Sequence, residues 1–254
     1  MQQPTRYQEI DLLRGTAILL MVVYHAAYDL SVYYHWHIAV QAGGWKILER
    51  CTAGLFLLLV GVSAAISFAR MWKQEIPLST RLLRHGKRAM MIGMGAAIVS
   101  ATTFAIDPET YVRFGILHLI AVSALLLPLL AFLREGNLLL GIVCFIAAKP
   151  LFALLPAPNV LLPLGKIPAN FSSVDYFPLF PWFGVILIGY AIGYLLYVRW
   201  ATWRTCIAAH LSTTNSKLST ASAPLALAGR HSLLLYLIHQ PIILGMLWMM
   251  LGPP

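Results

Sequence analysis

Long apolar runs separated by short polar connections are the feature that most constrains this chain. Several of these runs are long enough to cross the hydrocarbon core of a bilayer as a helix. Residues 47–68, for example, form a run of about 22 residues. The chain is therefore expected to fold as an all-α, polytopic membrane helix bundle of about seven transmembrane helices, forming a single domain over residues 1–254. The predicted spans are residues 11–30, 47–68, 89–104, 114–133, 138–155, 182–197 and 225–251.

The composition agrees with a membrane protein and disagrees with a soluble one. Hydrophobic residues make up 59% of the chain, charged residues only 11%, and the mean hydropathy is +0.76. A soluble domain carries about 25% charged residues. The three cysteines lie in or beside apolar runs without paired spacing, so we expect neither disulfides nor a metal site.

The positions of the basic residues predict the orientation in the membrane. The net charge of +9 could indicate a nucleic-acid partner, but the charges gather in alternate loops, so we expect none. With a cytoplasmic N-terminus, thirteen of the 18 Lys and Arg residues fall on the inner side, as the positive-inside rule requires. Seven spans then put the C-terminus outside, and the chain is expected in the cell inner (plasma) membrane.

Three connections have compositions that predict their structure. Residues 134–137 form a tight turn between two spans. Residues 156–181 contain six prolines and no long apolar run, which is typical of a non-crossing loop or a re-entrant segment. Residues 200–223 are basic and then rich in Ser and Thr, which predicts a flexible cytoplasmic loop.

The first span carries ionisable residues that lipid does not tolerate. At 100° per residue, Asp11, Arg14, His25 and Asp29 fall within one stripe of the helix, so this stripe should face the bundle interior or a wet cavity. Asp11 and Arg14 are spaced for a structural ion pair. His25 and Asp29 are four residues apart and can hydrogen-bond. The carboxylate would then set the imidazole tautomer and leave the other ring nitrogen free to act as a general base.

The predicted topology brings other polar residues to about the level of His25. These are Arg113 and His118 at the outer end of the fourth span, Asp175 before the sixth span, and His239 in the seventh. We expect this span to be interrupted at Gln240-Pro241. Pro241 frees a backbone carbonyl beside His239, which indicates either a polar site or a packing kink. His35 and His37 lie in an aromatic loop, where an interfacial role is expected in preference to metal binding.

The cluster between residues 70 and 88 is the densest group of basic side chains. It includes Arg84 and Arg88. We interpret it chiefly as a topology signal, with attraction of a phosphate-bearing cytoplasmic donor as the functional alternative.

Four blocks of sequence in order resemble a known family. The first block includes Arg6, Glu9-Ile10-Asp11-Leu12-Leu13-Arg14-Gly15, Met21, His25 and Asp29. The others are FGILH at 114–118, DYFPLFPWFG at 175–184 and GRHSLLLYLIHQP at 229–241. Together they look like the heparan-α-glucosaminide N-acetyltransferase catalytic-domain family of multispan acyltransferases, and the chain resembles its short bacterial members.

The resemblance implies transfer of an acetyl group from cytoplasmic acetyl-CoA to an amine or hydroxyl, commonly on a sugar, across the membrane. The family's catalytic histidine follows the first span on the outer side, which makes His35 or His37 an alternative to His25 as the base. Acetyl-CoA is expected as co-substrate, without a metal. The expected partners are lipid, acetyl-CoA and a sugar or other small acceptor, and a homodimer is compatible with the sequence.

We therefore expect each candidate residue to have one of three roles: catalysis, cofactor binding or substrate binding. One His deprotonates the acceptor, and His118 or His239 stabilises the developing oxyanion. A covalent acetyl-His intermediate is an open variant. The cofactor-binding candidates are Arg14, Arg230, His231, Arg84 and Arg88. The substrate-binding candidates are Arg113, Asp175 and Trp182.

Two other classes of protein are compatible with the same residues. A proton-coupled small-molecule transporter would use the His and Asp side chains as a relay, although no internal repeat supports it. A membrane cytochrome with bis-His haem ligation is the second alternative.

Overall fold

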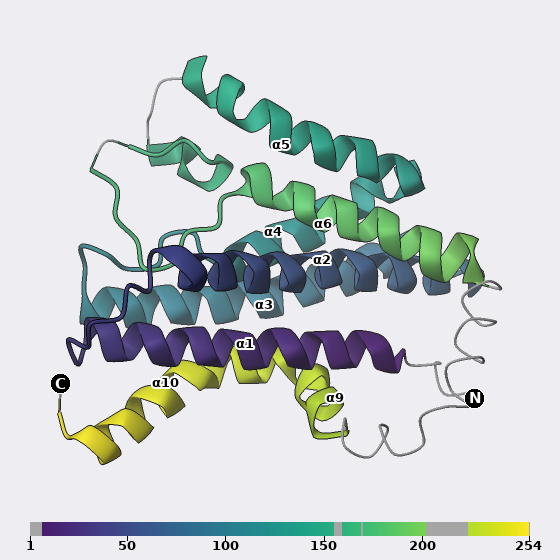
Figure 1. The fold of residues 1–254 in the computed structure, drawn as a ribbon. Coiled ribbons are helices and arrows are strands. Elements are labelled where there is room, and N and C mark those ends of the chain that lie inside the picture. The colour runs from purple at the N-terminus through teal and green to yellow at the C-terminus, as the bar shows by residue number, and fades with distance from the viewer. Residues whose placement is uncertain (1–6, 155–158, 169, 202–222, 254) are drawn as a thin grey trace. The chain divides into compact units, whose positions relative to one another are not determined.

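The computed structural model describes residues 7–154, 159–168, 170–201 and 223–253, and their regular secondary structure is helical (Figure 1). One isolated parallel bridge, between Phe114 and Tyr176, is the strand-like pairing found in these ranges. The predicted all-α fold is confirmed. The helices are α1 (Gln8–Val32), α2 (Gly43–Lys73), α3 (Leu78–Ile106), α4 (Ile116–Leu130), α5 (Asn137–Leu154), α6 (Leu179–Tyr194), α9 (Ala223–Arg230) and α10 (Ser232–Leu251), with the short helical turns η1 (Ala131–Gly136), η2 (Asn159–Leu164) and η3 (Leu195–Arg199).

Six stretches of the described chain are long and apolar enough to cross a membrane, where the sequence predicted about seven. The counts differ because the stretch Ile116–Ala148 joins α4 with most of α5. These two helices are separated by η1, in which Arg134 has a φ of 52°. This break lies where the sequence predicted a tight turn at residues 134–137. The six stretches are Gln8–Val32, Gly43–Lys73, Leu78–Ile106, Ile116–Ala148, Leu179–Arg199 and Ser232–Leu251.

The chain divides into two compact units. Met1–Phe56 and Ile207–Pro254 form the first unit, and Leu57–Cys206 form the second. The division falls within α2.

In the first unit, α9 lies against α1 at a very close approach (Figure 1). A Cβ added at Gly229 would lie 1.8 Å from the backbone oxygen of Asp11, and one added at Gly15 would lie 2.0 Å from that of Leu225. Small residues permit such backbone contact between membrane helices. Because the pairing runs from Asp11 with Gly229 to Gly15 with Leu225, α9 is antiparallel to α1.

The last helix, α10, runs parallel to α1. His25, in the C-terminal half of α1, contacts His239, in the N-terminal half of α10. Beyond the end of α1, the Tyr34 hydroxyl donates a hydrogen bond to the Gly252 carbonyl at 2.9 Å. When the first and last spans of a chain are parallel, the chain crosses the membrane an odd number of times. This direction therefore favours seven crossings, with α4 and α5 crossing separately.

The predicted seventh span, residues 225–251, is divided at a different position from the one expected. The prediction of an interruption at Gln240-Pro241 is wrong, because α10 continues through Pro241. Proline removes one backbone donor, and a long apolar helix can retain its other hydrogen bonds. The break falls at His231, whose φ of −103° and ψ of 25° separate α9 from α10.

In the second unit, α5 packs along α6, and α3 packs along α4. Tyr190 of α6 is completely buried, and its hydroxyl donates to the Ala131 carbonyl at 3.2 Å. Helix α3 contains the predicted span of residues 89–104 and begins before it, at Leu78. The added turns contain much of the basic cluster, since Leu, Arg and Lys form helices readily although they lower the local hydropathy.

Two junctions in the second unit connect segments that are distant in sequence. The Val174 amide donates to the Thr110 carbonyl at 2.8 Å, which joins the loop before α4 to the loop before α6. Elsewhere, Arg199 of η3 and Glu135 of η1 form an ion pair at 2.5 Å. Each junction joins segments that the sequence predicted to lie on the same side of the membrane.

Two predicted connections are only partly described by the structure. Within residues 156–181, the described positions before α6 contain only the short η2, as expected for a connection that does not cross. Most of the predicted flexible loop, residues 202–222, lies outside the described residues.

The α1–α9 contact predicts a large effect of a small substitution. We expect Gly229→Ala to destabilise the protein by about 1–3 kcal/mol, because the new methyl group must displace backbone. Gly245→Ala is the matched control, since a Cβ there meets nothing within 4 Å. Thermal unfolding in detergent measures both variants. Equal melting temperatures would contradict the close packing of α9 on α1.

The separate crossing of α4 and α5 can be tested by labelling. In a variant without native cysteines, Glu109→Cys and Gly136→Cys should react with a membrane-impermeant maleimide from opposite sides. We expect Glu109→Cys to react from outside and Gly136→Cys from the cytoplasm. Labelling of both from one side would exclude a crossing by α4.

Candidate functional site

A cluster of buried polar side chains lies where α10 contacts α1 in the first unit. We call His25, Asp29, His239 and Gln240 the α1–α10 polar cluster. The imidazole rings of His25 and His239 have their centroids 4.8 Å apart at an interplanar angle of 63°. The Gln240 Nε2 group donates to Asp29 Oδ1 at 2.7 Å. Asp29 has no exposed surface, and His239 is 9% exposed.

The surroundings of His239 set its tautomer. Its Nδ1 atom lies 2.7 Å from the backbone oxygen of Tyr236. A carbonyl oxygen only accepts hydrogen bonds, so Nδ1 must carry the proton when the ring is neutral. The lone pair is then on Nε2, which is buried and has no hydrogen-bond partner in the described part of the chain. His239 is therefore arranged to accept a proton at Nε2.

Other buried atoms of the cluster also have hydrogen-bonding capacity to spare. His25 Nδ1, Asp29 Oδ2 and Gln240 Oε1 have no partner among the residues that the structure describes. Unpartnered buried polar atoms are few in a folded protein. Three of the four unpartnered atoms, on Asp29, Gln240 and His239, are acceptors. The cluster thus suits a group that donates hydrogen bonds, such as a hydroxyl or an amine.

The hydrogen bond predicted between His25 and Asp29 is not formed. Asp29 Oδ1 instead accepts from Gln240, and His25 packs its ring against His239. Helix spacing correctly put His25 and Asp29 on one face, but it could not reveal an amide donor on another helix. Sequence reasoning did not select Gln240. A polar amide beside a histidine within an apolar span was the signal that could have found it.

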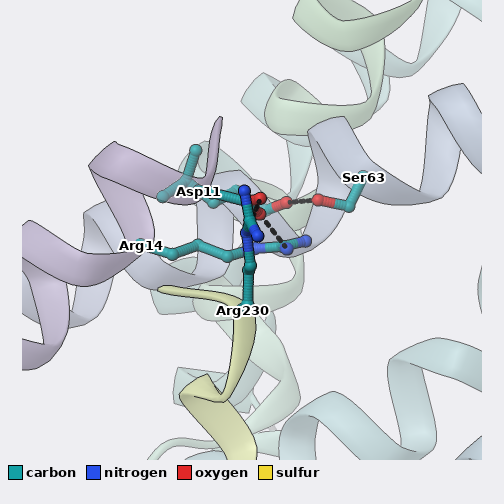
Figure 2. Close-up of polar contacts among 5 residues, drawn as sticks. Asp11, Arg14, Ser63 and Arg230 are labelled. Carbon is teal, nitrogen blue, oxygen red and sulfur yellow. Dashed lines mark hydrogen bonds and ion pairs between the residues drawn. The ribbon is translucent and has the colours of Figure 1, made fainter. Parts of the chain in front are cut away.

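A second polar cluster lies towards the N-terminal end of α1 (Figure 2). Arg14 Nη1 is 3.7 Å from Asp11 Oδ1, so the predicted ion pair is present. Arg230 Nε is 3.4 Å from Asp11 Oδ2. The Asp11 side chain is 5% exposed, whereas those of Arg14 and Arg230 are 24% and 39% exposed. The Asp11 carboxylate thus lies between two guanidinium groups that both reach solvent. His231, which follows Arg230, is also exposed.

The two clusters of the first unit lie at different levels along α1. Arg14 and His25 are eleven positions apart in one continuous helix. At 1.5 Å per residue this separation is about 16 Å along the axis. An elongated ligand could therefore place an anionic end near Arg14 and its other end near His25.

The second unit brings Asp175 and His118 together at the start of α4. Asp175 Oδ2 accepts from the Ile116 amide at 3.1 Å, and His118 Nδ1 accepts from the Gly115 amide at 3.3 Å. His118 Nε2 lies 3.4 Å from the hydroxyl oxygen of Ser100. Both ring nitrogens of His118 are thus occupied locally, which favours a role in holding this helix terminus.

Arg113 and Trp182 lie among aromatic rings of the same unit. The Arg113 guanidinium is 5.1 Å from the ring centroid of Tyr111 and 5.4 Å from that of Phe171. Trp182 packs against Phe177 with ring centroids 4.8 Å apart. The convergence of these residues with His25 and His239 in one site stays a prediction.

Two ionisable groups outside the spans stabilise the loops around Arg113. The hydroxyl of Thr110 and the amide of Glu109 donate to Asp107 and lower the pKa of its carboxyl. Burial raises the pKa of Tyr176 to about 12. Its hydroxyl therefore stays protonated at physiological pH and donates to the Leu162 carbonyl at 2.8 Å.

The remaining candidates are exposed. His35 and His37 lie in the loop after α1, where His35 has a φ of 57°. Arg84 and Arg88 are exposed on α3 in the second unit. Across the described ranges, no group of three or more His, Cys, Asp and Glu side chains is positioned to hold a metal ion.

The sequence matches a known protein family over most of its length. A family model described as "Heparan-alpha-glucosaminide N-acetyltransferase, catalytic" matches residues 6–241. Comparison with curated proteins and with solved structures found no match.

Proposed function

The chain belongs to the family of the heparan-α-glucosaminide N-acetyltransferase catalytic domain, and from this premise we propose that it moves an acetyl group from acetyl-CoA to an amine or hydroxyl, with a sugar as the favoured acceptor. The observation that carries the proposed site is the buried imidazole of His239. Its lone pair is held on Nε2 by the Tyr236 carbonyl. A positioned base of this kind contributes about 10²–10⁴-fold to proton transfer reactions.

In the proposed reaction, His239 Nε2 takes the proton from the acceptor while the acceptor's nitrogen or oxygen attacks the thioester carbonyl. The tetrahedral intermediate then collapses, the carbon–sulfur bond breaks, and the leaving thiolate takes the proton from the imidazolium. Asp29 Oδ2 accepts a hydrogen bond from the acceptor and orients it. His25 can donate to the developing oxyanion from a protonated ring nitrogen.

The alternatives from the sequence lead to distinct expectations. If the acetyl group is first transferred to an imidazole, His25 is the candidate nucleophile, and a labelled acetyl-enzyme should accumulate without acceptor. If the base lies in the loop after α1, His35 or His37 is required. His118 is assigned to holding the start of α4, because both its ring nitrogens have local partners.

The donor is proposed to approach from the cytoplasmic end of α1, and the acceptor from outside. Arg14 and Arg230 are partly exposed cations, and guanidinium groups suit the phosphates of CoA. Its slender pantetheine arm would follow α1 over about 16 Å to the imidazole pair. His231 and the exposed Arg84 and Arg88 are additional cationic candidates for the cytoplasmic side.

Activity of single histidine variants tests the chemistry. We expect His239→Ala and His25→Ala to lower acetyl transfer by about 100-fold or more. His118→Ala should retain activity in proportion to the folded protein. His85→Ala, on α3, is the control for loss of an imidazole elsewhere. The assay follows thiol release from acetyl-CoA in detergent, with glucosamine and methyl glucoside as amine and hydroxyl probes. Full activity of the His25 and His239 variants would overturn the site.

Binding of the donor can be measured without turnover. At a CoA concentration 100 times its Kd, binding stabilises the folded protein by about 2.7 kcal/mol, so the melting temperature should rise by several degrees. We expect Arg230→Ala to need a higher CoA concentration for the same rise. Arg50→Ala, at the opposite predicted side, should behave as the native protein. No rise with the native protein would favour the transporter.

A further inference from the structure

The hydrogen bond between Gln240 and Asp29 joins residues 211 positions apart in the chain. Gln240 donates through Nε2 to Asp29 Oδ1, and this is the hydrogen bond recorded for the Asp29 carboxylate in the described chain. A buried carboxylate without a donor is costly. Gln240 therefore has a structural reason to be present, but the geometry also suggests a second effect.

The amide restricts the direction of the carboxylate. With Oδ1 held at 2.7 Å by Gln240, the carboxylate plane cannot turn freely, and Oδ2 remains unpartnered and buried. Gln240 follows His239, and Asp29 lies one helical turn after His25. The hydrogen bond thus fixes α10 to α1 immediately beside the contact between the two imidazole rings. Movement of this contact by 1 Å can cost about 100-fold in rate.

We infer that Gln240 is a positioning residue for acyl transfer, which acts through Asp29 to hold the acceptor in line with His239 Nε2. This inference rests on the proposed acetyltransferase function. Gln240 does not touch the reacting atoms. It directs Asp29 Oδ2 towards the acceptor and keeps His239 in contact with His25.

An amide is better suited to this position than a carboxylate would be. Two carboxyl groups at hydrogen-bond distance cannot both ionise readily, so they share a proton. Gln240 provides the same N–H donor at every physiological pH. Within the first unit, the titratable groups beside this pair are His25 and Tyr28 on α1 and His239 on α10.

The first test is the effect of Gln240→Ala on kinetics in detergent, with glucosamine as the acceptor probe. We expect kcat to fall roughly 10- to 100-fold, with the KM for acetyl-CoA unchanged. Gln74→Ala, at an exposed glutamine outside the site, is the matched control and should keep native kinetics. Native kcat for Gln240→Ala would overturn the inference.

A pH profile separates positioning from simple loss of folding. In Gln240→Glu, the new carboxyl can replace the amide as a donor to Asp29 only while the pair holds its shared proton. Its activity relative to the native enzyme should therefore be greatest at acidic pH and fall as the pH rises. A loss that is the same at every pH, together with a lower melting temperature, would show that Gln240 is only structural and would overturn the inference.

A double-mutant cycle tests whether Gln240 acts through Asp29. In an Asp29→Asn background, Gln240→Ala should add little to the loss already present. Independent, multiplicative losses would contradict the inference. If the native protein shows no acetyl transfer to either probe and no stabilisation by CoA, the proposed function itself fails. If the native protein is active and the Gln240 variants have the same kinetics as the native protein, the proposed function stands and only the positioning role fails.

Discussion

A buried carboxylate in an apolar helix must find a donor within the protein, because lipid offers none. In the first unit this requirement is met by the hydrogen bond from Gln240 to Asp29. The bond ties α10 to α1, and it holds the two helices in the register that brings the imidazoles of His25 and His239 together. The packing of α9, with the glycine contacts at its crossing of α1, supports the same arrangement from the other end of the helix.

Polar side chains at the start of α4, in the second unit, have hydrogen-bond partners close by in the fold. Local hydrogen bonds at the start of α4 involve the side chains of Asp175, His118 and Ser100. The bond from Asp175 also joins the loop before α6 to α4. A histidine whose nitrogens are both occupied cannot exchange protons without breaking this structure. The contrast with His239, which keeps a buried lone pair on Nε2, explains why the proposed chemistry is assigned to the first unit.

Much of the fold was predictable, because the physical signals are local. Apolar runs predicted the helices, and the polar stripe of the first span predicted that Asp11, Arg14, His25 and Asp29 share a face. The differences also have physical causes. The basic first turns of α3 lower the local hydropathy, so they lie outside the predicted span of residues 89–104. Pro241 was expected to interrupt a helix, but α10 continues through it. Part of the candidate site was found by the rarity of ionisable groups in a membrane span, but Gln240 is uncharged and escaped that criterion.

The sequence by itself determined that this protein is a helical membrane protein with polar residues on particular faces of its spans, since helix periodicity and transfer free energy depend on neighbours along the chain. Only the tertiary structure decided which of those polar groups are partners. Asp29 pairs with Gln240 and not with His25, and Arg230 joins Asp11 across the chain. These choices depend on how distant helices pack and in which direction they run, and no local pattern specifies that.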